Sequence, residues 1–123
     1  WETINNFGDM NWTTSQLSVE LNGAPGKVGT TRVLTLPDGG QIREVLVKYS
    51  DEKQTFSYVV LEGVLPVTNY RATVKVVKEA EGVTRVKWSS LFDAVEGVED
   101  AVAINAITGI YRNSLNGLKQ TME

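Results

Sequence analysis

The chain has 123 residues and a formal net charge of −3, and it contains neither cysteine nor histidine. This inventory suits one domain over residues 1–123 and excludes disulfides, thiolate metal sites, cysteine nucleophiles and Ser-His-Asp triads. Its 12 basic residues are scattered among 15 acidic ones, and no apolar run approaches the roughly 20 residues of a membrane span, so we predict a cytoplasmic protein that binds no nucleic acid.

The first 22 residues predict short helical segments followed by a strand. Trp1, Ile4 and Phe7 share one side at helical spacing, and a glycine follows them. Residues 8–14, GDMNWTT, predict a second helical turn. Apolar and polar side chains then alternate between Leu17 and Leu21, which is typical of a half-buried strand.

Residues 29–94 predict an antiparallel meander. The stretch GTTRVLTLPDGGQIREVLV has two β-branched and aliphatic runs around a Pro-Asp-Gly-Gly turn, so it predicts a hairpin with strands over 30–36 and 41–49. Further strands are predicted over 54–63, 69–80 and 82–94, joined by short polar turns. Strands as long as the last two are typical of sheets that curve strongly.

Residues 96–122 change to a period near 3.6 and predict a long amphipathic helix. Asp93 or a neighbouring residue is the predicted cap of its start, with Glu96 reaching back as in a capping box. Gly109 and Gly117 lie inside the helix, each at a cost of up to about 1 kcal/mol relative to alanine. Two adjacent apolar rows define the expected buried face: Val98, Val102, Ala106, Ile110, Ser114 and Leu118, beside Ala103, Ile107, Tyr111 and Leu115.

This order of elements predicts an α+β fold in which a curved antiparallel sheet wraps around the C-terminal helix. Seven segments in sequence carry a resemblance to a known family: WETINNFGDMNW, VGTTRVLTL, the DGG turn, IREVLVKYSD, SYVVLEGVLPVTNYRATVKVV, TRVKWSSLF and ITGIYRNSLNGLK. Together they resemble the polyketide cyclase/dehydrase-like branch of the START and Bet v 1-type helix-grip (SRPBCC) superfamily.

The resemblance implies a seven-stranded sheet that grips the C-terminal helix, two short helices between the first two strands, and a hydrophobic cavity between sheet and helix. The first strand of the family would precede Trp1. We therefore expect six to seven strands, with the first family strand missing and an edge that invites pairing.

Arg32 and Glu44 are charged residues within the predicted hairpin. Alternation alone leaves two faces open for the second strand: either Ile42 and Glu44 or Arg43 and Val45 face inward. If the turn places Leu36 opposite Ile42, Arg32 and Glu44 become diagonal neighbours on one face.

The resemblance implies that Arg32, Glu44 and Tyr70 point into the cavity, and the lachrymatory-factor synthase of plants has a similar Arg, Glu and Tyr set. A desolvated guanidinium can bind an anionic or enolate-like oxygen while a carboxylate and a phenol move protons. The alternative is a purely structural ion pair between Arg32 and Glu44.

The predicted ligand-binding set is wider than this trio. It also includes Tyr58 and Trp88, for which a plain core role is the alternative, and Gly109, which either approaches a ligand or packs helix against sheet. The full predicted set is Arg32, Glu44, Leu46, Phe56, Tyr58, Tyr70, Trp88, Phe92 and Gly109.

The first functional hypothesis is a module that binds a small hydrophobic or aromatic molecule in the cavity. The second is an enzyme of the cyclase, dehydratase or isomerase type that uses Arg32, Glu44 and Tyr70. A weaker third is a protein-partner or assembly module. We expect a monomer or homodimer, with no metal or other cofactor.

Overall fold

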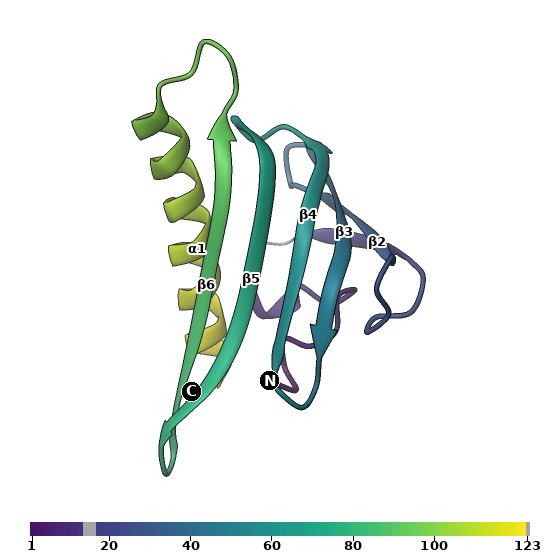
Figure 1. The fold of residues 1–123 in the computed structure, drawn as a ribbon, viewed down its shortest axis with the longest axis vertical. Coiled ribbons are helices and arrows are strands. Elements are labelled where there is room, and N and C mark those ends of the chain that lie inside the picture. The colour runs from purple at the N-terminus through teal and green to yellow at the C-terminus, as the bar shows by residue number, and fades with distance from the viewer. Residues whose placement is uncertain (14–16, 123) are drawn as a thin grey trace.

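The computed structural model describes residues 1–13 and 17–122. These residues form one six-stranded antiparallel sheet whose strands neighbour one another in chain order (Figure 1). The α+β layout predicted from the sequence is confirmed. The strands are β1 (Ser18–Asn22), β2 (Thr31–Thr35), β3 (Gln41–Ser50), β4 (Thr55–Gly63), β5 (Val67–Ala80) and β6 (Val83–Ala94).

One long helix, α1 (Asp100–Met122), follows the sheet and runs beside β6 in the opposite direction (Figure 1). It begins after Glu99, whose carbonyl accepts hydrogen bonds from the backbone N–H groups of Val102 and Ala103 at 3.0 and 3.2 Å. The predicted cap at Asp93 is wrong, because that residue belongs to β6 and its carboxylate accepts a hydrogen bond from Asn69 Nδ2. The chain needs a turn after the strand before the helix can begin.

The buried face of α1 is narrower than the predicted double row. Val102 and Ile110 are 54% and 38% exposed, although the apolar pattern placed both toward the core. The sheet meets the helix along one stripe, and the outer apolar row lies at its margin. The buried residues are Ala103, Ile107, Ser114, Gly117 and Leu118.

The N-terminal segment forms turns where the sequence predicted a first helix. The backbone N–H groups of Ile4 and Asn5 both donate to the Trp1 carbonyl, which closes a single turn. The Asn6 and Asp9 side chains then accept hydrogen bonds from backbone N–H groups two residues on, an arrangement that competes with helix formation. The predicted second helical turn is a 3₁₀ helix, η1 (Asn11–Thr13), and Thr14 lies outside the described residues.

The core lies between the sheet, α1 and this N-terminal segment. Phe7 is almost completely buried and contacts the rings of Phe56 and Tyr58, while Trp12 packs against Trp88. The chain therefore closes the space between sheet and helix from one side with its first residues. Within the part of the chain described, no helix is long and apolar enough to cross a membrane.

Candidate functional site

Arg32 and Glu44 face each other directly across β2 and β3. The predicted diagonal placement is wrong, because Leu34, not Leu36, pairs with Ile42. The Leu36 N–H instead donates to the Gly40 carbonyl at 2.8 Å, and the Gly39 N–H donates to the Leu36 carbonyl at 2.9 Å, which closes the hairpin. The difference is two residues, so both charges keep the same face of the sheet.

The two side chains form a buried ion pair. Arg32 Nε donates to Glu44 Oε1 at 2.7 Å, and the side chains are only 3% and 6% exposed. Arg32 Nη1 also donates to the Phe7 carbonyl at 3.1 Å and lies 3.4 Å from Met10 Sδ. The guanidinium is thus held by the N-terminal segment as well as by the sheet.

Aromatic rings complete the surroundings of Arg32. Its Cζ atom lies 3.9 Å from the centre of the Phe7 ring and 5.1 Å from that of Tyr58. A desolvated guanidinium over an aromatic face gains on the order of 2 kcal/mol. The charge is therefore compensated by a carboxylate, a carbonyl and ring faces together.

Burial raises the pKa of Glu44 above its ordinary value, and the neighbouring Arg32 opposes this rise in part through its charge and its hydrogen bond. The carboxylate is costly to desolvate, so it depends on Arg32 to remain ionised. Glu44 lines the interior, and because its pKa is raised it binds a proton more tightly than an exposed glutamate does.

Tyr70 enters the same interior from β5, and a β-bulge sets its direction. The β5–β6 register shifts between Thr68 and Arg71, and Asn69 has a left-handed φ of +53°. A bulge of this kind adds a residue to one strand and redirects the side chains beside it. Asparagine tolerates the left-handed conformation better than most residues, which explains why this sequence bulges immediately before Tyr70.

The Tyr70 hydroxyl is hydrogen-bonded to the hydroxyl of Tyr111 on α1. Tyr111 stacks on Trp88 with ring centres 4.3 Å apart, and Trp88 Nε1 donates to the Tyr58 hydroxyl at 3.1 Å. We call Tyr58, Tyr70, Trp88 and Tyr111 the aromatic cluster. It joins three strands to the helix through neutral polar groups.

The three phenols of the aromatic cluster remain protonated in the physiological range. Burial raises the pKa of Tyr58, Tyr70 and Tyr111 well above the ordinary value, and the neighbouring phenols add to the shift. Each hydroxyl can donate one hydrogen bond and accept two. The cluster therefore offers hydrogen bonds without adding charge.

The ion pair and the aromatic cluster border one cavity of about 220 Å³ between the sheet and α1. Its walls come from the N-terminal segment, from strands β2 to β6, from the loops and from the helix. The lining residues are Met10, Leu17, Arg32, Leu34, Leu36, Ile42, Glu44, Tyr58, Leu65, Tyr70, Trp88, Ile107, Ile110, Tyr111, Asn113 and Ser114.

Five residues of the predicted ligand-binding set lie on this cavity: Arg32, Glu44, Tyr58, Tyr70 and Trp88. The other four lie elsewhere in the described structure. Leu46 and Phe56 are buried in the core, and Phe92 stacks on Tyr70 with ring centres 5.9 Å apart. At Gly109 an added Cβ would meet nothing within 4 Å, so no close packing requires a glycine there.

Tyr111 is the main site residue absent from the predicted set. A signal was present, since Tyr111 interrupts the apolar row of Ala103, Ile107 and Leu115 with a hydroxyl. A buried tyrosine usually finds a polar partner, and here the partner is Tyr70. The Phe7 carbonyl, by contrast, carries no sequence signal, because any residue could supply it.

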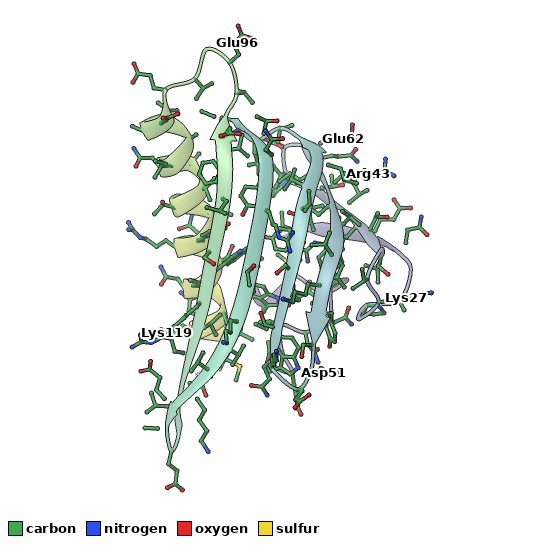
Figure 2. The ribbon with its side chains drawn as sticks, in the orientation of Figure 1. Lys27, Arg43, Asp51, Glu62, Glu96 and Lys119 are labelled. Carbon is green, nitrogen blue, oxygen red and sulfur yellow. The ribbon has the colours of Figure 1, made fainter. Side chains whose placement is uncertain are left out.

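Of the further depressions, one of about 270 Å³ beside β4 and β5 shares Leu65 and Tyr70 with the cavity, and two others lie away from these groups. One of about 910 Å³ involves Thr31, Val33 and Arg43, which alternate with the inward residues of their strands and so belong to the outer face of the sheet. Figure 2 shows Arg43 and Glu62 on this side, far from α1. The other, of about 570 Å³, lies near the end of α1 between Trp1, Val86 and Leu118. Both have fewer converging buried polar groups than the interior cavity.

Acidic side chains do not gather anywhere in residues 1–13 and 17–122 in a group of three or more that could hold a metal ion. The polar groups that line the interior cavity are instead one compensated ion pair, three phenols, the Trp88 indole and the side chains of Asn113 and Ser114. Such an arrangement can orient an organic molecule or move a proton.

Comparisons with known proteins agree with the fold. The whole chain, residues 1–123, matches the family model described as polyketide cyclase / dehydrase and lipid transport. Many solved structures are similar to it. A putative uncharacterized protein from Bacillus thuringiensis is 32% identical with a TM-score of 0.87, covering 98% of this chain and 86% of that one.

The protein XoxI from Bacillus cereus is 34% identical with a TM-score of 0.87. The alignment covers 98% of this chain and 83% of the XoxI chain. Major latex-like protein 151 from Panax ginseng, at 24% identity and a TM-score of 0.65, shares the fold over 87% of this chain and 80% of its own. A search of curated proteins found no match. The chain belongs to the polyketide cyclase/dehydrase and lipid transport family, the branch that its sequence motifs predicted.

Proposed function

We propose that this protein binds a small hydrophobic or aromatic molecule in the cavity between its sheet and α1. The observation that carries the proposal is the partly open cavity of about 220 Å³, which apolar side chains line and on which a few polar groups converge. Ligand sites in proteins have this composition, with a mostly apolar wall and a small number of orienting polar groups.

The polar groups around the cavity are paired with one another. Across the described residues, no buried side-chain nitrogen or oxygen lacks a hydrogen-bond partner. A ligand must therefore gain most of its affinity from apolar burial, and its polar atoms must exchange with bonds that already exist, such as that between Tyr70 and Tyr111.

The test is a titration of the ¹⁵N-labelled protein with toluene, benzamide, naphthalene and oleate, followed by NMR at the Trp88 indole N–H. Two isoleucines of α1 provide a matched pair of variants. Ile110 lines the cavity, while Ile104 is 52% exposed and does not. We expect binding of at least one probe to weaken tenfold or more in Ile110→Trp and to be unchanged in Ile104→Trp. Absence of binding by every probe, or equal binding by both variants, contradicts the proposal.

A second candidate function is a cyclase, dehydratase or isomerase activity at the same cavity. The observation that favours it is Glu44, a cavity-lining carboxyl group with a raised pKa. Perturbed acids of this kind are frequent at catalytic sites. In an isomerisation, the Glu44 carboxylate would take a proton from one carbon and return it to another, while the Tyr70 hydroxyl donates to the intermediate enolate oxygen.

The test searches for a substrate among small molecules extracted from the purified protein, which are then incubated with fresh protein. Mass spectrometry and chromatography detect dehydration as a loss of water and isomerisation as a change in retention. We expect Tyr70→Phe and Glu44→Gln each to lower turnover by 100-fold or more while the protein stays folded. Full turnover in both variants excludes these catalytic roles.

A further inference from the structure

The size of the cavity limits what it can hold. A cavity of roughly 150 Å³ in a protein core takes one benzene molecule, and sites for drug-sized ligands begin at roughly 300 Å³. At about 220 Å³, this cavity lies between the two. Its dimensions suit one substituted ring, and a fused-ring system or a long acyl chain would extend beyond it.

The charge of the cavity limits the ligand further. Among the described lining residues, Arg32 and Glu44 are the charged ones, and they neutralise each other at 2.7 Å. The Nη1 atom of Arg32 already donates to the Phe7 carbonyl. A ligand carboxylate would lose its hydration and compete with Glu44 for the same guanidinium, which a buried anion cannot do without a large desolvation cost.

The neutral polar contacts come from the other end of the cavity. The Tyr70 and Tyr111 hydroxyls share one hydrogen bond and keep further acceptor positions, and Tyr111 and Trp88 stack on each other beside them. A ring with an amide or hydroxyl group can pack against this aromatic pair and exchange hydrogen bonds with the two phenols.

We propose that the ligand of this cavity is a neutral molecule of about one substituted ring, anchored by the Tyr70 and Tyr111 hydroxyls, and that the ion pair excludes carboxylates of the same shape. This inference rests on the proposed binding function. It goes beyond that function by assigning the ligand's size and charge and by giving Tyr111 a role in recognition.

The test compares benzamide with benzoate, which have nearly the same shape and differ in charge, and benzamide with anthracene-9-carboxamide, which adds two rings. Binding is measured at pH 7 through the Trp88 indole N–H resonance. We expect benzamide to bind at least tenfold more tightly than benzoate and the anthracene amide to leave the resonance unchanged.

The anchoring role of Tyr111 is tested by the ratio of the affinity for benzamide to the affinity for toluene. We expect Tyr111→Phe to lower the affinity for benzamide relative to toluene by at least threefold. Tyr49→Phe is the matched control, because the Tyr49 hydroxyl bonds to Asp51 away from the cavity and its loss should leave the ratio unchanged. An unchanged ratio in Tyr111→Phe overturns the anchoring role.

The outcomes separate the two proposals. Binding of benzoate as tight as that of benzamide, or binding of the anthracene amide or oleate in this cavity, overturns the inference on charge or size while the general binding function stands. If none of these molecules, neutral or charged, small or large, perturbs Trp88, both proposals fail together.

Discussion

The two polar ends of the cavity are built in opposite ways. Arg32 and Glu44 lie on neighbouring strands, carry full charges and are held at 2.7 Å with support from Phe7 and Met10. The aromatic cluster joins the sheet to α1 through neutral hydroxyls and stacked rings. The ion pair is buried and also holds the N-terminal segment against the sheet, whereas the aromatic cluster is buried in part and joins the sheet to α1.

This difference suggests that the two polar ends of the cavity have different roles. An ion pair within one sheet is a fixed part of the wall, because moving either charge leaves the other buried alone. Neutral phenols exchange partners at the cost of a hydrogen bond, roughly 1 kcal/mol. The charged end therefore shapes and neutralises the cavity, and the aromatic end makes the contacts that a ligand can use.

The largest expected effect comes from breaking the charged end. Arg32→Met leaves Glu44 buried without its partner and should lower the free energy of unfolding by about 3 to 5 kcal/mol, measured by urea denaturation. Arg43→Met is the control, because Arg43 and Glu62 form an exposed pair at 3.8 Å and its loss should cost less than about 1 kcal/mol.

The double variant Arg32→Met/Glu44→Leu sharpens this result. Replacing both charges with apolar groups removes the unpaired carboxylate, so most of the lost stability should return. Equal losses in Arg32→Met and Arg43→Met would contradict a structural role for the buried pair.

The bulge that directs Tyr70 gives the next effect. Asn69 has φ +53°, a conformation that a β-branched residue adopts at a cost of roughly 1 to 2 kcal/mol. Asn69→Val should therefore destabilise the protein by about that amount in urea denaturation, whereas Asn69→Gly should cost much less. If valine is tolerated as well as glycine, the backbone at this bulge does not constrain Tyr70.

The pH dependence of stability reports on Glu44. Because burial raises its pKa, the folded protein binds this proton more tightly than the unfolded chain does. The resulting contribution to stability is fully present below the ordinary value of 4.5 and is lost as the pH rises through the folded pKa. The unfolding free energy of the native protein minus that of Glu44→Gln should therefore increase as the pH falls from neutral toward that value.

Urea titrations at several pH values measure this difference. Comparing two proteins that differ at one position cancels the contributions of the other acidic residues. A difference that decreases on acidification would mean that Arg32 outweighs burial and lowers the pKa of Glu44.

The smallest effect on stability is expected outside both the ion pair and the aromatic cluster. Gly109 lies within α1, and an added methyl group would contact nothing within 4 Å. Gly109→Ala should stabilise the protein by up to about 1 kcal/mol, because alanine has the higher helix propensity. Its ligand affinity should not change. A loss of affinity would restore Gly109 to the ligand-binding set in which the sequence placed it.

The fold was largely predictable because its elements have distinct periods. Alternation in residues 29–94 predicted the meander, and the change to a period of 3.6 predicted α1. The predicted hairpin register was wrong by two residues. It still placed Arg32 and Glu44 on one face, because side chains alternate with a period of two. The helix start was less predictable, since a turn after β6 displaced the cap from Asp93.

The site was predictable in part. Arg32, Glu44 and Tyr70 drew attention as polar groups in inward positions, and all three line the cavity. Tyr111 was counted with the apolar row of α1, because periodicity identifies a face without showing which partner a hydroxyl meets there. The bond from Arg32 to the Phe7 carbonyl depends on how the N-terminal turns fold, which side-chain patterns do not specify.

The most direct test of the central claim is the position of a bound probe, measured by intermolecular NOEs from benzamide to ¹³C-labelled methyl groups. The interior cavity and the depression on the outer face of the sheet have different methyl groups, so each gives a distinct pattern. Binding between sheet and helix predicts NOEs to Leu34 and Ile107. NOEs to Val33 and Val64 on the outer face, with none to Leu34 or Ile107, would contradict an interior ligand site.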